Sequence, residues 1–313
     1  MNKLPINLPN IFENEHLYGY VSRLCLLNGI LDSNSIQKGI MGCNKALAAL
    51  PLFKESTHEL AIFISDKFSL PLADVFTRHT LLGLFRHNID PTVLRKVVAK
   101  DYSRKTVISL EQTEVYWGKA WRYCPCCVEE DKVQHGTAYW HVEHQLPTSL
   151  TCYKHVKTTL EYKCQKCGLV TTNLGCKPIP TAQCEKCGHT HESMSLHLNR
   201  DQKSIQESGF RLFNDTSNFD SSMQYYMLDV DSIVRSREDI SESLELRYKE
   251  LDGSFFDWLS ESELTVYFGH DSSIGTVQSL RAHRMVRYSG RAKLLYVLLW
   301  QRYFYHLRQT AKQ

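Results

Sequence analysis

Nine of the eleven cysteines of this chain fall between Cys124 and Cys187. In a cytoplasmic protein such a cluster indicates metal binding, because that compartment keeps thiols reduced. The opening residues, MNKLPINLPN, lack the apolar segment of a secretory signal. No apolar run approaches the roughly 20 residues that a membrane span requires. We therefore expect a cytoplasmic protein without a membrane segment, whose middle third is organised by metal ions.

Eight residues of this region form two sets of paired ligands. The first set combines a C-x2-C pair with a C-x2-H pair, and the second combines two C-x2-C pairs. These sets are Cys124, Cys127, Cys152 and His155, and Cys164, Cys167, Cys184 and Cys187. Two residues between ligands let the backbone curl so that both side chains reach one ion, and a glycine after each half of the second set permits the left-handed turn that this needs. The spacing predicts two structural Zn²⁺ ions per chain.

The first set leaves some choice of ligand open. Cys126 lies inside the first pair and is able to replace a neighbour. His135, His141 or His144 are alternatives to His155. The remaining cysteines, Cys25, Cys43 and Cys176, are interpreted as small buried residues or a bystander.

We expect no catalytic activity. Four protein ligands close a zinc ion, whereas catalytic zinc keeps a position for water. His141-Val142-Glu143 is similar to the H-x-E of zinc deaminases, but here it follows its nearest cysteine pair, and no Pro-Cys-x-x-Cys comes after it. The sequence also has no phosphate-binding glycine loop, no HExxH and no nucleophile elbow.

The first third of the chain has the apolar spacing of helices. Asn14 is a candidate cap for a helix beginning near Leu17, and Gly29 is a candidate stop. Pro71 is expected at the first position of another short helix, so residues 68–71 (FSLP) predict a helix-turn-helix. If this hairpin binds DNA, the candidate phosphate ligands are Arg78, His79, Arg86 and His87. An equally weighted interpretation is a packing unit with a solvated face.

The predicted fold is mainly α, with small zinc-binding β and loop modules. We expect a helical N-terminal domain with a helix-turn-helix-like hairpin over residues 1–116. Two zinc fingers or ribbons follow over residues 117–192, and a C-terminal helical domain occupies residues 193–313. Its closing helix has core positions at Leu294, Leu295, Leu298, Leu299, Phe304 and Leu307.

The charge of the chain is unevenly distributed. The net charge is only +3, but residues 281–308 carry seven Lys or Arg and no Asp or Glu. Four of these, Arg281, Arg284, Arg287 and Arg291, are three or four positions apart and so share a helix face. This face is a candidate for contact with nucleic acid or an acidic partner, and a solvated surface is the simple alternative.

Three stretches resemble the TniQ/TnsD family of target-selection proteins from bacterial transposons. The opening, LPNIFENEHLYGYVSRLCLLNG, is similar to the family's proline-rich entry and helix ending in Arg-Leu-x-x-x-Asn-Gly. The central residues 122–168 resemble its Cys-Pro-x-Cys pair, acidic turn, aromatic strand, Cys-x-x-His and Cys-x-x-Cys. The stretch FSLPLADVFTRHTL is similar to its helical hairpin. The resemblance covers residues 5 to about 190.

The resemblance implies a non-catalytic adaptor for DNA transposition. Such a protein would link a CRISPR Cascade-type complex with its guide RNA to an AAA+ ATPase of the TnsC type and the transposase, in some cases as a homodimer, and would associate with the nucleoid. One alternative is a TnsD-like protein that binds an attachment site on DNA directly. Another, outside the family, is a zinc-containing transcription regulator. Mild net charge favours the adaptor.

Overall fold

The computed structural model describes residues 7–30, 55–89, 91–99, 120–171, 179–215, 244–260, 266–268, 278, 280–287 and 293–310. Helices dominate these ranges, and the β structure within them is limited to isolated antiparallel bridges. The elements are α1 (Leu17–Leu27), α3 (Glu55–Phe68), α4 (Leu72–His79), α5 (Leu82–Phe85), η1 (Arg86–Asn88), α6 (Pro91–Val98), α8 (Pro125–His135), α9 (Val142–Gln145), α10 (Arg200–Phe213), α12 (Leu244–Trp258), α15 (Ala282–Arg287) and α16 (Leu294–Thr310). The prediction of a mainly α fold with cysteine-rich modules is confirmed.

Helix α1 begins at Leu17, as predicted, but its cap lies two residues after the predicted one. His16 is the capping residue, and its Nδ1 accepts a hydrogen bond from the backbone N–H of Tyr18 at 3.2 Å. Asn14, the predicted cap, has a φ of 52° and turns its side-chain amide to Glu143 instead. The predicted stop at Gly29 is found: its φ is 62°, a conformation that glycine adopts without the steric cost of a Cβ.

Helices α3 and α4 form the predicted hairpin. They pack against each other across a short connection in which Ser69 has a φ of 53°. The hydroxyl of Ser65 donates to the carbonyl of Leu70 at 2.7 Å, which fixes the end of α3. Pro71 is the residue just before α4 rather than its first helical position.

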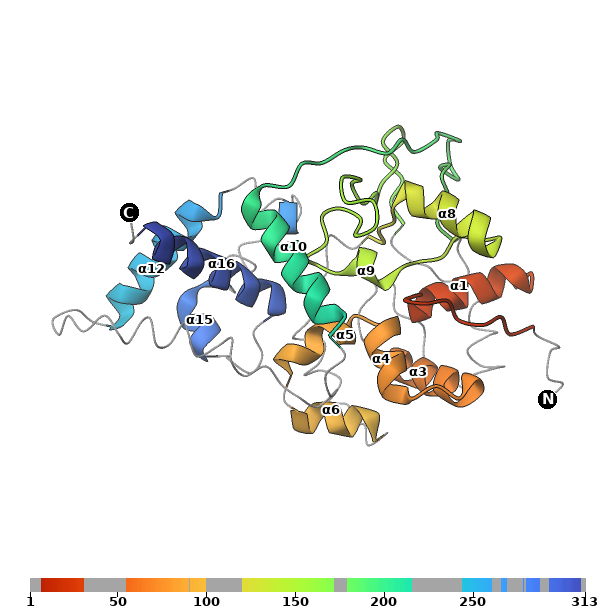
Figure 1. Cartoon of the computed structure of the whole chain (residues 1–313), viewed down its shortest axis with the longest axis horizontal. Helices are drawn as coiled ribbons and strands as arrows, with labels where there is room; N and C mark the ends of the chain where they lie inside the picture. The colour runs from red at the N-terminus through yellow and green to blue at the C-terminus, as the bar shows by residue number, and fades with distance from the viewer. Residues whose placement is uncertain are drawn as a thin grey trace.

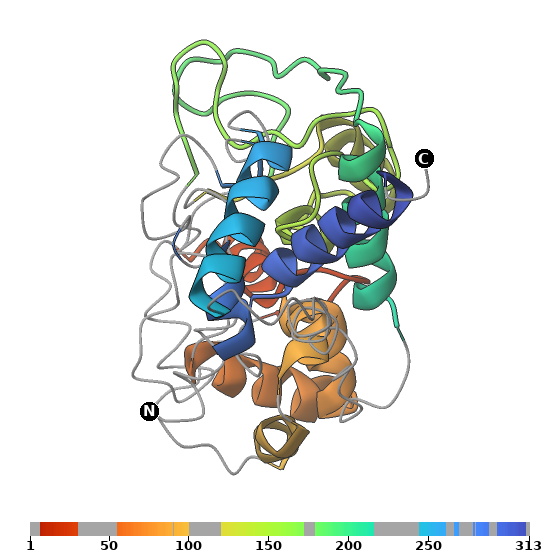
Figure 2. The same cartoon turned by 90° about the vertical axis from the view of Figure 1, so that its left-hand side faces the viewer.

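Helix α10 lies between the N-terminal helices and α16 (Figure 1), and a perpendicular view keeps α10 and α16 side by side (Figure 2). It also packs against α5. Its Gln206 Oε1 accepts the backbone N–H groups of Leu150 and Thr151, at 2.8 and 3.0 Å. Gly209 allows α10 to lie close to Thr148, because a Cβ at position 209 would be 2.1 Å from Thr148 Oγ1. Helix α10 thus joins the helical parts to the cysteine-rich region.

The closing helix α16 buries the leucines that the sequence assigns to its core. Leu295 and Leu299 are fully buried, and Leu307 is partly buried. Trp300 stacks on Phe255 of α12 with ring centroids 3.9 Å apart. No helix in the described ranges combines the length and the apolar character needed to cross a membrane.

Buried apolar side chains from all three predicted segments belong to one contiguous cluster, which runs from Leu17 of α1 to Phe304 of α16. A second, small cluster contains Cys124, Cys127, Cys152 and Leu160. The predicted domain limits of 1–116, 117–192 and 193–313 remain predictions.

Candidate metal centres

The first ligand set converges on one point. The Sγ atoms of Cys124, Cys127 and Cys152 and the Nδ1 atom of His155 all lie within 4.8 Å of one another. His155 Nδ1 is 3.4, 3.5 and 3.6 Å from the three sulfurs, and the sulfurs of Cys127 and Cys152 are 3.5 Å apart. A tetrahedral zinc ion with bonds of about 2.3 Å to sulfur and about 2.0 Å to nitrogen has ligand-to-ligand edges of roughly 3.5–3.8 Å. The four donors therefore fit a zinc ion.

Two local structures bring these donors together. Cys124 is the residue that precedes α8, and Pro125 occupies the first helical position, so Cys127 lies one turn further on the same side. Cys152 and His155 lie on a tight turn closed by backbone bonds from Cys152 N to Thr158 O at 2.9 Å and from Thr158 N to His155 O at 2.6 Å. The first pair is thus built by a helix start, without a glycine turn.

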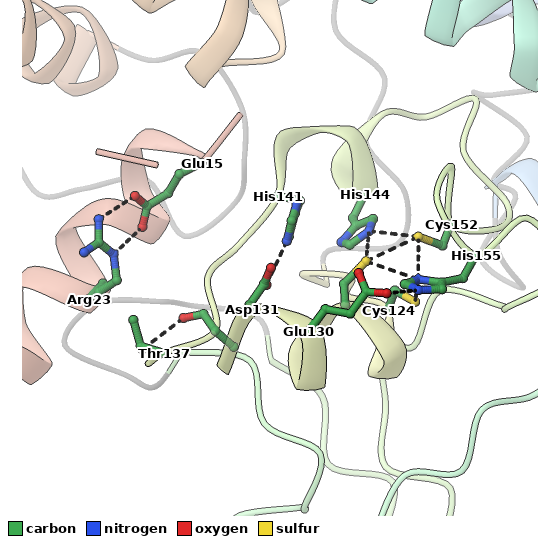
Figure 3. Close-up of polar contacts among 12 residues, drawn as sticks. Glu15, Arg23, Cys124, Glu130, Asp131, Thr137, His141, His144, Cys152 and His155 are labelled. Carbon is green, nitrogen blue, oxygen red and sulfur yellow. Dashed lines mark hydrogen bonds and ion pairs between the residues drawn. The ribbon is translucent and has the colours of Figure 1, made fainter. Parts of the chain in front are cut away.

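The acidic residues after the first cysteine pair, which the resemblance described above places in a turn, belong to α8. Glu130 Oε1 lies 2.8 Å from Nε2 of His155. Asp131 is buried, and its Oδ2 lies 2.9 Å from Nε2 of His141. Figure 3 shows both pairs beside the sulfurs. A carboxylate on the far nitrogen of a ligating histidine fixes the ring and its tautomer. Glu130 is therefore a supporting residue that the sequence reasoning missed.

The alternative ligands of the first set occupy different places. Cys126 points away, with its Sγ 3.8 Å from Ser193 Oγ and 3.9 Å from Thr158 Oγ1. His135 is exposed and stacks on Phe12. His141 faces Asp131. Only His144 approaches the site: its Nε2 is 3.6 Å from Cys152 Sγ and 3.8 Å from Cys127 Sγ.

His144 is fully buried, and burial lowers its pKa to about 4, so its imidazole is neutral at neutral pH. Figure 3 shows its ring directed at two of the sulfurs. The H-x-E residues His141 and Glu143 do not join the converging donors, and Glu143 Oε1 accepts a hydrogen bond from Asn14 instead. The geometry thus contains no arrangement of the deaminase kind at these residues.

The second ligand set is also assembled. Its four sulfurs lie within 4.8 Å of one another, with Cys164 and Cys187 3.7 Å apart and Cys167 and Cys184 3.6 Å apart. These separations match the sulfur-to-sulfur edge of a tetrahedral Zn²⁺ site, about 3.8 Å. The donors fit a zinc ion here as well.

Each half of the second set is a small hairpin. Cys164 N donates to Leu169 O at 2.8 Å, and Cys184 N donates to His189 O at 2.8 Å. Gly168 and Gly188 have φ values of 69° and 66°, the left-handed turn that their positions after the pairs predict. The backbone amides of Cys167 and Lys166 lower the pKa of the Cys164 thiol to about 6, which favours the thiolate that a metal requires.

Among the residues that the structure describes, the other cysteines take no part in these sets. Cys25 is buried in the main core, as the sequence indicates for a small apolar residue. Cys43 and Cys176 lie outside the described residues.

Glu15 connects the N-terminal helices to the first metal module, by which we mean residues 120–160 around the first donor set. Its carboxylate accepts two hydrogen bonds from Arg23 of α1, at 2.8 and 2.7 Å, and both side chains are buried. Its carbonyl oxygen is 2.8 Å from His79 Nδ1 at the end of α4. Its backbone forms an antiparallel bridge with His141. The Arg-Leu-x-x-x-Asn-Gly motif therefore begins with Arg23, the residue that holds Glu15 in this bridging position.

Three of the four basic residues predicted to contact phosphate are buried. Arg86 donates to backbone carbonyls of Gly83 and Asp215, and His87 Nε2 lies 2.7 Å from Leu212 O. His79 is engaged by Glu15. The interpretation of His79, Arg86 and His87 as phosphate ligands is wrong, because these side chains serve internal packing. Arg78 alone is exposed.

The arginine series near the C-terminus is described only in part. Arg281 and Arg284 are exposed at the start of α15. Arg287 ends this helix, and its side chain is not described. Arg291 lies outside the described residues. Whether the four share one face remains a prediction.

The tyrosine and tryptophan residues of the first module are mostly internal. Trp140 is 2% exposed and Tyr139 is 6% exposed. A Cβ on Gly19 of α1 would lie 2.8 Å from Trp140 Cβ, so the helix packs directly on this ring. Tyr153 is half-buried and stacks on Phe210 of α10 with centroids 5.0 Å apart. These aromatic rings hold the module against α1 and α10.

The described residues thus form a mainly helical protein in which a helical hairpin accompanies two sets of four converging donors that fit zinc. Residues 8–157 match the sequence model of the TniQ family. They include α1, the hairpin and the four donors of the first set, so this segment of the chain is similar to a TniQ domain. The transposon Tn7 transposition protein TnsD of Escherichia coli is 22% identical over 154 residues, which cover 48% of this chain and 30% of TnsD. The chain thus aligns with less than a third of that relative's length.

Proposed function

We propose that the chain binds two structural Zn²⁺ ions and selects target sites for DNA transposition without catalysing a reaction itself. The proposal is supported by the TniQ domain over residues 8–157 and by the similarity to the transposition protein TnsD. It is also supported by the two sets of four mutually close donors, because four protein ligands leave no position for a reacting water.

Within this role, we infer an adaptor that binds a CRISPR Cascade-type complex and recruits an AAA+ ATPase of the TnsC type. The observation that favours it is the surface of the α3–α4 hairpin. Its exposed charges on α4 are Asp74 and Arg78, which cancel, while His79 is buried. A helix that enters a DNA groove needs cationic or polar side chains free to reach phosphates and base edges. Protein contact therefore suits this hairpin better than duplex DNA.

Direct recognition of an attachment site is the second candidate. It is favoured by Arg281 and Arg284, which are exposed and one helical turn apart. Arginines in such positions would each contribute a phosphate contact. The adaptor and the direct DNA-binding protein differ in whether the isolated chain binds a specific DNA sequence.

Gel-shift titrations of the zinc-loaded full chain distinguish them. Duplex DNA with and without a candidate attachment sequence is tested at two salt concentrations. The adaptor predicts weak binding without sequence preference, and retention of the chain by an immobilised guide-RNA complex. Sequence-specific binding at physiological salt would refute the adaptor and support the second candidate.

A variant with glutamine at Arg281, Arg284, Arg287 and Arg291 adds a second criterion. If these residues bind DNA, each lost phosphate contact reduces the salt slope of binding by about one unit. If the adaptor role holds, the variant leaves the weak DNA binding nearly unchanged. Zinc content and circular dichroism of the variant verify that the fold survives.

A further inference from the structure

The first metal centre has more donors than a tetrahedral ion uses. Three sulfurs and His155 form the converging set, and His144 presents a second imidazole to two of these sulfurs, those of Cys152 and Cys127. His144 Nε2 is 3.6 and 3.8 Å from the sulfurs of Cys152 and Cys127. His155 Nδ1 is 3.6 and 3.5 Å from the same two atoms. The two histidines therefore approach this sulfur pair to nearly equal distances.

The two imidazoles are held in different ways. His155 lies on the turn after Cys152, where its side chain is 22% exposed and is held by Glu130, which is itself 45% exposed. His144 lies on α9, is 1% exposed, and its Nδ1 has no hydrogen-bond partner in the described part of the chain. A buried imidazole whose Nε2 faces sulfur atoms is a suitable nitrogen donor for zinc.

We propose that His144 is a reserve ligand of the first centre, able to complete the coordination of the metal when His155 leaves. The zinc ligands would then be three cysteines and one histidine, whether that histidine is His155 or His144. The turn carrying Lys154, His155 and Val156 would be free to change conformation without loss of the ion. Lys154 and Val156 are exposed, Val156 to 64%, and His155 is partly exposed. This inference rests on the proposal that the first donor set holds zinc.

A different role is open to the same geometry: His144 could act only as an N–H donor to sulfur. The two roles predict different results when the histidines are replaced singly and together. A reserve ligand matters chiefly when His155 is absent, so the two substitutions are strongly non-additive. A hydrogen-bond donor contributes equally whether or not His155 is present, so the two effects add in free energy.

The experiment measures zinc content and the rate of zinc release to a chromogenic chelator for the native chain and three variants: His155→Ala, His144→Gln and the double variant. Glutamine retains a side-chain N–H donor but is a poor zinc ligand. We expect two zinc ions per chain in both single variants. The double variant should keep the zinc of the four-cysteine centre. After loading with zinc, it should release the ion of the first centre at least about 10-fold faster than His155→Ala does. The matched control is His155→Ala with His135→Gln, because His135 is exposed and lies outside the donor set.

A second measurement does not require a substitution at the buried position. X-ray absorption at the zinc edge of His155→Ala should retain the scattering of one imidazole per two zinc ions. Scattering from oxygen or nitrogen without an imidazole ring would overturn the proposal, since water or Glu130 would then be the fourth ligand. Additive effects in the double variant would also overturn it. Fewer than two zinc ions in the native chain would refute the underlying zinc proposal instead, so the two failures are distinguishable.

Discussion

Glu130 and His155 form the contact that positions the exposed ligand of the first metal centre. Glu130 Oε1 lies 2.8 Å from His155 Nε2, while His155 Nδ1 faces three sulfurs. The carboxylate thus selects the tautomer whose Nδ1 lone pair is directed at the metal position. The pair joins α8 to the turn after Cys152, two segments that the sequence separates by 25 residues.

Glu130→Gln should therefore weaken the first centre without abolishing it. Loss of a partner that orients a metal-bound histidine typically lowers metal affinity about 10- to 100-fold. Competition with a zinc chelator measures this effect for each centre. Glu129→Gln is the matched control, because Glu129 is exposed and, among the described residues, pairs with Lys132 one turn away. Equal zinc affinity in the two variants would show that the Glu130 contact does not support the ion.

Cysteine substitutions separate ligands from bystanders. Cys126→Ser should retain two zinc ions per chain, since its sulfur lies against Ser193 and Thr158 and outside the converging donors. Cys184→Ser should retain one, and should yield aggregating or partly unfolded protein, because zinc binding contributes directly to folding. Metal analysis of the purified proteins and their thermal unfolding check both outcomes. Loss of zinc from Cys126→Ser would assign that sulfur to the first centre.

The contact between Gly209 and Thr148 predicts a strong effect from a single methyl group. In Gly209→Ala the new Cβ would meet Thr148 at 2.1–2.7 Å, so α10 would be displaced from the metal module. Overpacking of this kind costs about 1–3 kcal/mol of unfolding free energy. Gly253→Ala is the matched control: it lies within α12 with no atom within 4 Å of its Cβ, and should stabilise the chain by about 1 kcal/mol. Chemical unfolding of both variants tests the prediction, and equal stabilities would contradict it.

The metal donors were predictable because their geometry is local. Residues three apart at a helix start or in a glycine-closed turn lie together whatever the rest of the chain does, as Cys124 and Cys127 show. The sequence also contains end signals for helix α8, with Pro125 at its start and Gly136 after its end, but the family resemblance indicated an acidic turn there. Recognition of that helix would have placed Glu130 one turn beyond Cys127.

Other features depend on contacts far apart in the sequence. Arg86 and His87 look like exposed basic residues, but α10 covers them, and Arg86 and His87 bond to backbone carbonyls more than 120 residues away. The role of Glu15 likewise depends on His141, with which its backbone pairs. Apolar periodicity within one helix does not contain such information, because it reports which face is buried and not which segment buries it.

Glu143 lies in the short helix α9 and is 2% exposed. Its Oε1 accepts a hydrogen bond from Asn14, and its Oε2 has no hydrogen-bond partner among the described residues. Burial raises the pKa of Glu143 to about 7 from an ordinary value of 4.5. The folded chain therefore binds this proton more tightly than the unfolded chain does. Its contribution to stability is complete below about pH 4.5 and is lost as the pH rises through about 7.

Glu143→Gln resembles the protonated side chain at every pH. The variant and the native chain should have similar unfolding free energies near pH 5. By pH 8 the variant should be more stable by about 2–3 kcal/mol, because the native chain must then keep a buried carboxylate charged. Denaturant unfolding with excess zinc at pH 5.5, 7 and 8 measures the difference, in which any pH dependence of the metal centres cancels. The exposed Glu192→Gln is the control and should show a constant difference. If the Glu143→Gln and native curves run parallel from pH 5.5 to 8, Glu143 does not titrate in this range and the prediction is wrong.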